Sequence, residues 1–144
     1  MKYQLQKRFF LVSVLALFIA TSIAQQTSLD EFGELVDGVQ NVSAEEASQI
    51  LTSFPEVRVL DVRTGFEYRR GHIKNAVNLN YYSLFFRTNL DELDKDTIWL
   101  VHCKVGVRSS KTLPMMKKLG FKNIIHMTHG IDEWRKAGLN EVKD

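Results

Sequence analysis

A short loop between an apolar strand and a helix, spanning Leu100–Ser110, constrains the fold more than any other segment. Cys103, the only cysteine of the chain, opens this loop, and one glycine and two cations follow it. The flanking residues predict a strand over 97–101 and a helix over 109–119. A strand that passes through a tight loop into a helix is the building unit of an α/β sheet.

The rest of the chain continues this alternation. Short apolar, β-branched runs predict strands, and capped or periodic runs predict helices. Ser43 and Glu46 have the spacing of a capping box, which predicts where the helix at 44–52 begins. The expected strands lie at 39–42, 57–62, within 72–79 and at 123–127, and the expected helices lie at 44–52, 64–71, 81–90 and 131–136. This order predicts an α/β fold of three layers, a mainly parallel sheet with helices on both faces. Asp61 ends one expected strand and Cys103 follows another, so parallel strands would place both residues at the same edge of the sheet.

The first 24 residues are typical of an export signal. Cations come first, an apolar run over 9–20 follows, and small residues end at Ala24. The apolar run is shorter than the roughly 20 residues that a membrane-spanning helix needs. We therefore expect a signal peptide over 1–24, export to the periplasm or the medium if the source is bacterial, and no stable membrane span after cleavage. An uncleaved anchor is the alternative.

Loss of this segment changes the charge balance. Lys2, Lys7 and Arg8 lie inside it, and no acidic residue precedes Asp30. Of 19 basic and 17 acidic residues, 16 and 17 therefore remain, a formal charge of −1. With no basic stripe interleaved with aromatic residues, the sequence gives no indication of a nucleic-acid partner.

Removal of 24 of the 144 residues leaves 120, enough for one compact domain. We expect this domain over 39–144. The preceding segment, 25–38, is polar at first and then places Leu29, Phe32 and Leu35 at helical spacing. It is expected to be an N-terminal arm or a short helix.

Cys103 is either a packed core thiol or a nucleophile, and its surroundings favour the nucleophile. An exported chain with one cysteine forms no internal disulfide, so the thiol stays unpaired or pairs with another molecule. Backbone N–H groups of the loop and the dipole of the following helix can converge on the sulfur. Lys104 and Arg108 add positive charge, which favours the thiolate at neutral pH.

Three motifs in this order and spacing resemble single-domain rhodaneses, the thiosulfate sulfurtransferases. The resemblance extends from about Val39 to Leu139. Its motifs are Leu60–Arg63 with Glu67 and Gly71–Ile73, the loop Cys103–Ser109, and Gly130–Trp134.

The resemblance implies a rhodanese-like fold and a double displacement. Thiosulfate, a small anionic sulfur donor, would leave its outer sulfur on Cys103 as a persulfide. A thiol or cyanide acceptor, or a sulfur-accepting protein, would then remove that sulfur. No metal or organic cofactor is required. The six residues from Cys103 to Arg108 also fit a sulfur atom, whereas related dual-specificity phosphatases carry one residue more.

The site residues follow from the same resemblance. Cys103 is the expected nucleophile, and Arg108 is suited to fixing a sulfonate by two parallel hydrogen bonds. Val105 and Val107 make the rim more apolar than in most relatives. Asp61 and Arg63 are expected to support the loop. The expected substrate-binding residues are Lys104, Val105, Gly106, Val107 and Arg108.

Other polar residues have structural interpretations. Arg63 and Glu67 are expected to pair as i,i+4 neighbours. Strand alternation directs His102 away from the face of Cys103, as a packed histidine. His126 and His129 lack companion ligands at metal-binding spacing.

A second class of function stays open beside the enzyme. The chain is then a sulfur-carrier or redox interaction module of the same fold, with little turnover, whose Cys103 exchanges sulfur with a partner protein. The aromatic segment 81–86 is either its docking surface or part of the core. Turnover with thiosulfate and cyanide separates the two classes.

Overall fold

The computed structural model describes residues 28–143. The chain divides into two compact units, Met1–Glu31 and Phe32–Asp144. The expected signal peptide over 1–24 lies outside the described residues, and the described part of the first unit contains a 3₁₀ turn, η1, at Leu29–Glu31. No helix within 28–143 is long and apolar enough to cross a membrane.

The second unit is built on a six-stranded sheet in the order β1-β2-β6-β5-β3-β4. Five strands run parallel, and β1 pairs antiparallel with β2. The strands are β1 Glu34–Val36, β2 Val39–Val42, β3 Arg58–Asp61, β4 Val77–Asn78, β5 Ile98–His102 and β6 Asn123–Met127.

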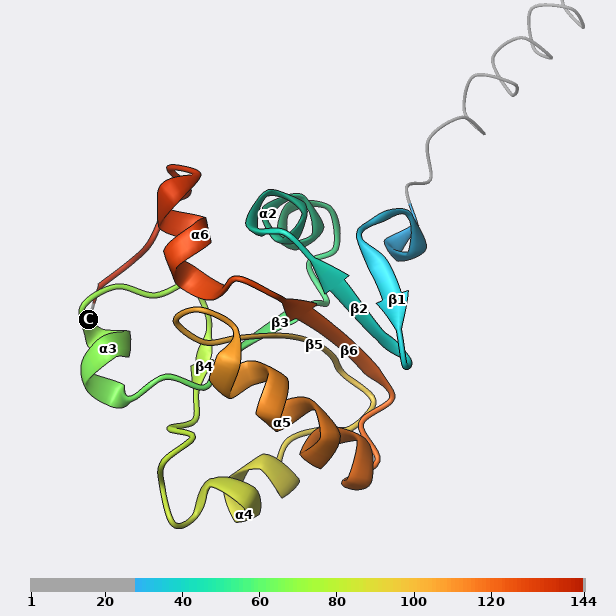
Figure 1. Ribbon diagram of the computed structural model, residues 1–144, viewed down its shortest axis with the longest axis vertical. Coiled ribbons are helices and arrows are strands. Elements are labelled where there is room, and N and C mark those ends of the chain that lie inside the picture. The colour runs from blue at the N-terminus through green and yellow to red at the C-terminus, as the bar shows by residue number, and fades with distance from the viewer. Residues whose placement is uncertain (1–27, 144) are drawn as a thin grey trace, which may run out of the picture. The chain divides into compact units, whose positions relative to one another are not determined.

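The helices lie on both faces of this sheet, which confirms the predicted three-layer α/β fold. Figure 1 shows α2 and α6 on one face and α4 and α5 on the other. The helices are α2 Ala44–Ser53, α3 Gly65–Arg69, α4 Phe86–Asp91, α5 Val107–Lys118 and α6 Gly130–Lys136.

Local chemistry fixes where α2 begins. The Ser43 hydroxyl accepts the N–H of Glu46, and the Glu46 carboxylate accepts the N–H of Ser43, which is the predicted capping box. Hydrogen bonds from the Ser43 backbone, then from Gly33, hold the pKa of Glu46 below its usual range despite partial burial. The helix buries Ala44, Ala47 and Ile50 against the sheet.

The core follows the central strands. Trp99, Leu100 and Val101 of β5 are all buried, as expected for a parallel strand covered on both faces. Trp134 of α6 is also buried. Both tryptophans are therefore core residues.

Residues 28–38 of the segment expected to be an arm or a short helix contain the 3₁₀ turn η1 and a strand that was not predicted. Glu34–Val36 forms the edge strand β1, and Asp37 and Gly38 turn the chain at positive φ (50° and 73°) into β2. Such a turn matches the twist of an antiparallel hairpin. Leu35 is 74% exposed, so the helical spacing of apolar residues here does not mark a packed face.

The aromatic segment before α4 is a turn rather than the first part of a helix. The helix begins at Phe86, whereas 81–90 was the predicted range. The Asn80 side chain and carbonyl accept the N–H groups of Tyr82 and Ser83. These bonds close a turn that leaves Tyr82 and Phe85 exposed and only Phe86 buried.

Candidate active site

Cys103 directly follows β5 and is 1% exposed. Asp61 ends the adjacent parallel strand β3, where it pairs with His102, so both strands deliver side chains to the same sheet edge. This confirms the prediction that Asp61 and Cys103 share an edge. Ligands in α/β sheets bind beyond the carboxyl ends of the strands, which is where the thiol lies.

Two glycines hold the loop after Cys103 against the turn between β6 and α6. A Cβ on Gly106 would lie 1.8 Å from the Thr128 carbonyl oxygen, and one on Gly130 would lie 2.5 Å from the Cys103 carbonyl oxygen. Gly106 has φ +87° and caps α5, which therefore begins at Val107 and not at the expected residue 109. The loop between Cys103 and the helix is thus two residues shorter than predicted.

The loop favours the thiolate of Cys103. Burial is the largest single influence and acts to raise the pKa of the thiol. Hydrogen bonds from the Ser109 N–H and hydroxyl, then from the N–H groups of Val105 and Arg108, outweigh it and bring the pKa below its ordinary value. The Ser109 hydroxyl lies 3.6 Å from Sγ. Val105 and Arg108, two of the expected substrate-binding residues, therefore act on the sulfur through their N–H groups, and Ser109 adds a donor that the prediction did not include.

Arg108 is held by a carboxylate from α3. Its two terminal nitrogens donate to the two oxygens of Glu67, each at 2.8 Å. The Thr64 N–H and hydroxyl donate to the same carboxylate at 3.0 and 2.8 Å. The hydrogen bonds from Arg108, ahead of those from Thr64, lower the pKa of Glu67 to about 2, and the carboxylate raises the pKa of Arg108.

The expected pairing of Arg63 with Glu67 is wrong. Arg63 turns into the interior and pairs with Asp61, with Nε 2.9 Å from Oδ2 and a terminal nitrogen 2.6 Å from the same oxygen. It also donates to the Gly71 carbonyl at 2.8 Å. Asp61 and Arg63 are 0% and 1% exposed. The i,i+4 spacing alone did not predict that Asp61, at the end of β3, would be the buried partner of Arg63.

The remaining loop side chains point outward. Lys104 Nζ lies 2.8 Å from Asp132 Oδ2, and both side chains are substantially exposed. Val105 and Val107 are 51% and 56% exposed. Tyr82 lies close by, because the Arg108 guanidinium carbon is 5.7 Å from its ring centroid. The loop therefore presents backbone donors to the sulfur and an apolar rim to the solvent.

A buried polar chain lies behind the thiol. The Ser109 hydroxyl is 2.9 Å from both the Gly106 carbonyl oxygen and His126 Nε2, and His126 Nδ1 is 3.2 Å from Asn41 Oδ1. Burial, with His102 and His129 nearby, lowers the pKa of His126 to about 4, so this imidazole is neutral at neutral pH. Sequence reasoning missed this chain, because the packing of α5 brings Ser109 to His126 and the pairing of β2 with β6 brings Asn41 beside it.

His102 is fully buried, as predicted for a packed histidine. Its Nδ1 lies 3.1 Å from the Cys103 carbonyl oxygen, and its Nε2 lies 3.7 Å from Asp61 Oδ2. Burial, the largest influence, lowers its pKa despite the Asp61 carboxylate. Within 28–143, no group of three or more His, Cys, Asp or Glu side chains could hold a metal ion.

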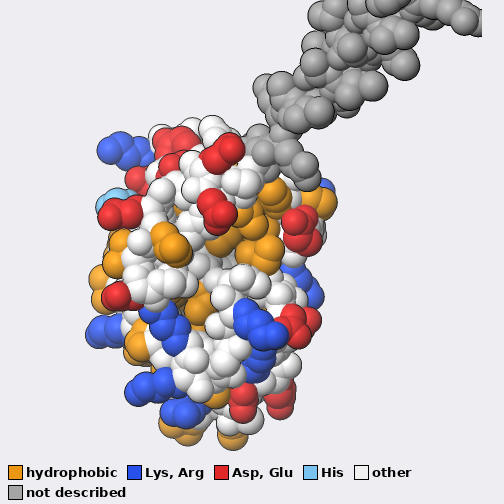
Figure 2. Space-filling view, turned by 90° about the vertical axis from the view of Figure 1, so that its right-hand side faces the viewer, with side chains coloured by type: hydrophobic (Ala, Val, Ile, Leu, Met, Phe, Trp, Pro, Cys, Tyr) orange, Lys and Arg blue, Asp and Glu red, His pale blue; other side chains and the backbone are white. Residues whose placement is uncertain are grey.

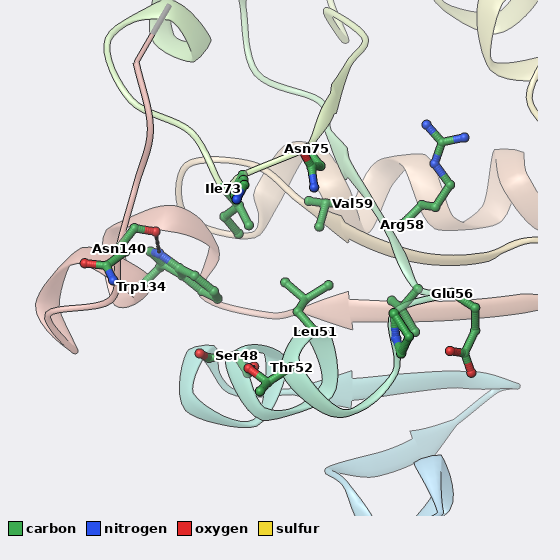
Figure 3. A pocket seen from close by; sticks show the side chains of 13 residues that line it. Ser48, Leu51, Thr52, Glu56, Arg58, Val59, Ile73, Asn75, Trp134 and Asn140 are labelled. Carbon is green, nitrogen blue, oxygen red and sulfur yellow. Dashed lines mark hydrogen bonds between the residues drawn. The ribbon is translucent and has the colours of Figure 1, made fainter.

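A cavity of about 690 Å³ lies on the face of the sheet that α2 and α6 cover. Figure 3 shows Leu51, Val59, Ile73 and Trp134 lining it from different elements. None of its lining residues belongs to the Cys103 loop. On the face shown in Figure 2, acidic and basic side chains are interspersed around a group of hydrophobic ones, and neither sign of charge dominates.

Comparisons with known proteins agree with this fold. A family model described as "Rhodanese-like domain" matches residues 43–137. A "Sulfurtransferase" of Allochromatium vinosum is 28% identical over 101 residues, 70% of this chain and 92% of that protein. The "Putative sulfur carrier protein YrkF" of Bacillus subtilis is 31% identical over 101 residues, 70% of this chain and 54% of that protein.

Other relatives are longer than the matched region. The chain spans 30% of the tRNA uridine(34) hydroxylase of Anaplasma marginale, which is 32% identical over 84 residues covering 55% of this chain. Among solved structures, a rhodanese-related protein from Thermoplasma volcanium has a TM-score of 0.64 at 26% identity, over 72% of this chain and 98% of that one.

Proposed function

The chain belongs to the rhodanese-like domain family, and on that basis we propose that it is a sulfurtransferase whose Cys103 carries sulfane sulfur as a persulfide. The donor is thiosulfate or a similar small sulfur compound, and the acceptor is thiophilic, such as cyanide or a thiol. The observation that carries the proposal is a single thiol at a strand end, with its pKa lowered by hydrogen bonds from the following loop. Family members with sulfurtransferase names support the reaction class.

The proposed reaction has two displacements at Cys103. The thiolate attacks the outer sulfur of the donor, the donor's S–S bond breaks, and sulfite leaves with the electron pair when the donor is thiosulfate. The acceptor then attacks the terminal sulfur of the persulfide and regenerates the thiolate. N–H groups of Val105, Arg108 and Ser109 are aimed at the sulfur and would stabilise the negative charge in both steps.

The other expected residues act through the loop. Gly106 allows the turn that brings these N–H groups together, and we assign it a positioning role. Asp61 and Arg63 form a buried ion pair next to the loop, and we assign them a supporting role.

Mass spectrometry tests the proposal. The full chain and its Cys103→Ser variant are incubated with thiosulfate and their intact masses are measured. We expect the wild type to gain the mass of one sulfur atom, the variant to gain none, and cyanide to remove the added sulfur. If iodoacetamide modifies Cys103 but thiosulfate adds no sulfur, the proposed reaction is wrong.

The sulfur-carrier function remains the second candidate, because one relative is a putative sulfur carrier protein. A carrier would load sulfur in a single turnover but release it slowly to cyanide or small thiols. A steady-state turnover rate similar to the rate of single-turnover loading would support the enzyme instead.

We also propose that the chain is exported and cleaved after Ala24, as its N-terminal sequence pattern predicts. N-terminal sequencing of the secreted or periplasmic protein tests this. A mature chain that begins at Gln25 is expected, and a chain found only inside the cell with Met1 intact would contradict it.

A further inference from the structure

We propose that this site prefers an organic sulfane-sulfur donor with an apolar group and at most one negative charge over dianionic thiosulfate. This inference rests on the proposed function, since it specifies the donor that forms the same Cys103 persulfide. Three features carry it: the Arg108–Glu67 pair, the Lys104–Asp132 pair and the apolar rim.

The Arg108 charge is already balanced beside the thiol. Both terminal nitrogens of Arg108 donate to Glu67 at 2.8 Å, and Thr64 fixes that carboxylate through two further hydrogen bonds. An anion that approaches Arg108 therefore also approaches an ionised carboxylate. A dianion meets twice the repulsion that a monoanion meets at the same distance.

Lys104 does not supply the free positive charge that Arg108 lacks because of its pairing with Glu67. Its ammonium group pairs with Asp132 at 2.8 Å, and its side chain is 54% exposed, where solvent weakens its interactions. Lys104 and Arg108 are the two cations of the loop, and each is paired with an acidic side chain. The remaining stabilisation for a donor anion comes from backbone N–H groups, which carry only partial charges.

The rim offers apolar surface instead. Val105, Val107 and Tyr82 are 51%, 56% and 68% exposed, and the Tyr82 ring lies over the Arg108 guanidinium. An apolar group on the donor would remove part of this surface from water, which favours binding. Thiosulfate has no such group.

The chemistry is that of the proposed reaction with a different leaving group. The Cys103 thiolate attacks the terminal sulfur of R–SO₂–S⁻, the S–S bond breaks, and the sulfinate R–SO₂⁻ leaves with the electron pair. With a hydropersulfide R–S–SH, the thiolate R–S⁻ leaves in the same way. Both donors share a sulfane sulfur on an organic carrier R.

Matched donors test the preference. Second-order rate constants for persulfide formation are measured by intact mass with thiosulfate, with benzenethiosulfonate and with benzyl hydropersulfide. Because the donors differ in intrinsic reactivity, the informative quantity is how each rate constant changes in a variant. Glu67→Gln removes the carboxylate charge while keeping an oxygen for Thr64. We expect it to favour thiosulfate over benzenethiosulfonate by about tenfold relative to wild type.

Control variants separate charge from disruption. Asp132→Asn should shift the same ratio in the same direction, but less, because its pair is exposed. Asp96→Asn makes an equal charge change at the exposed pair with Lys122 and should leave the ratio unchanged. Val107→Ser should slow benzenethiosulfonate several-fold more than thiosulfate. Thermal melts identify any variant that fails to fold.

The outcomes distinguish a failure of the donor preference from a failure of the proposed sulfurtransferase function. If Glu67→Gln and Asp132→Asn change the rate constants of both donors equally, the charge argument is overturned. If Val107→Ser affects both donors equally, the apolar rim does not select the donor. If benzenethiosulfonate loads Cys103 and benzyl hydropersulfide does not, the donors are thiosulfonates only. The proposal that any sulfane sulfur on an apolar organic group is accepted would then be wrong. If no donor loads Cys103, the proposed function itself fails.

Discussion

Replacement of Asp61 by alanine should destabilise this domain severely, because it leaves a buried cation without its partner. Asp61 accepts hydrogen bonds from the Arg63 N–H, Nε and a terminal nitrogen, at 2.9, 2.9 and 2.6 Å. The two side chains are 0% and 2% exposed. The guanidinium of Arg63 also donates to the Gly71 carbonyl, and in Asp61→Ala this hydrogen bond remains while those to Asp61 are lost.

The expected magnitude follows from burial. Removal of one partner from a buried ion pair costs about 3–5 kcal/mol. A domain of this size has a free energy of unfolding of about 5–15 kcal/mol, so the loss is a large fraction of the total. With a typical urea m-value of roughly 2 kcal/mol per molar, the unfolding midpoint should fall by about 2 M.

Urea denaturation followed by circular dichroism measures this loss, with a double variant as the informative comparison. Asp61→Leu with Arg63→Met removes both charges and fills similar volume, so it should be clearly more stable than Asp61→Ala. Asp96→Ala breaks an exposed pair with Lys122 and should leave the urea midpoint close to that of the wild type. An Asp61→Ala midpoint within 0.5 M of wild type, about 1 kcal/mol at this m-value, or a double variant no better than the single one, would refute the reasoning.

Three further results are expected. Ser109→Ala removes a hydroxyl hydrogen bond that lowers the pKa of Cys103, so the pH–rate profile of persulfide loading should move to higher pH; an unmoved profile contradicts this. Gly106→Ala places a Cβ 1.8 Å from the Thr128 carbonyl oxygen at φ +87°, so loading by mass spectrometry should be lost, and wild-type loading would argue against the loop geometry. Glu67, with its pKa lowered from 4.5 to about 2, stabilises the fold above about pH 4.5, and this stabilisation is lost as pH falls towards 2. Denaturation at several pH values should show a flatter profile in that window for Glu67→Gln, and an equally steep one would contradict the assignment.

Sequence patterns predicted the elements whose causes are local. The capping box at Ser43 and Glu46 requires residues three positions apart, and the structure contains it. Cys103 and Asp61 were placed at one edge because parallel strands share their carboxyl ends, and β3 and β5 are neighbours. Both inferences needed only spacing and strand direction.

Features set by tertiary contacts were not predictable in the same way. Glu67 pairs with Arg108, 41 positions away, because α3 meets the first turn of α5. The spacing rule offered Arg63 as its partner, but Arg63 precedes Thr64, the N-cap of α3, and so lies outside the helix to which that rule applies. The link from His126 to the thiol depends on how α5 packs on β6, because Ser109 of α5 contacts both. The strand at Glu34–Val36 depends on a turn with two positive φ angles.

The two edge strands of the sheet affect how strongly the protein aggregates at high concentration. The outermost strands, β1 and β4, contain three and two residues. Unpaired backbone groups on long edge strands allow sheets of different molecules to join, and very short edges offer too few of them for stable pairing. The exposed apolar side chain of Leu35 on β1 therefore lies on an edge too short to template intermolecular sheet growth. The native domain should thus resist aggregation through its sheet edges.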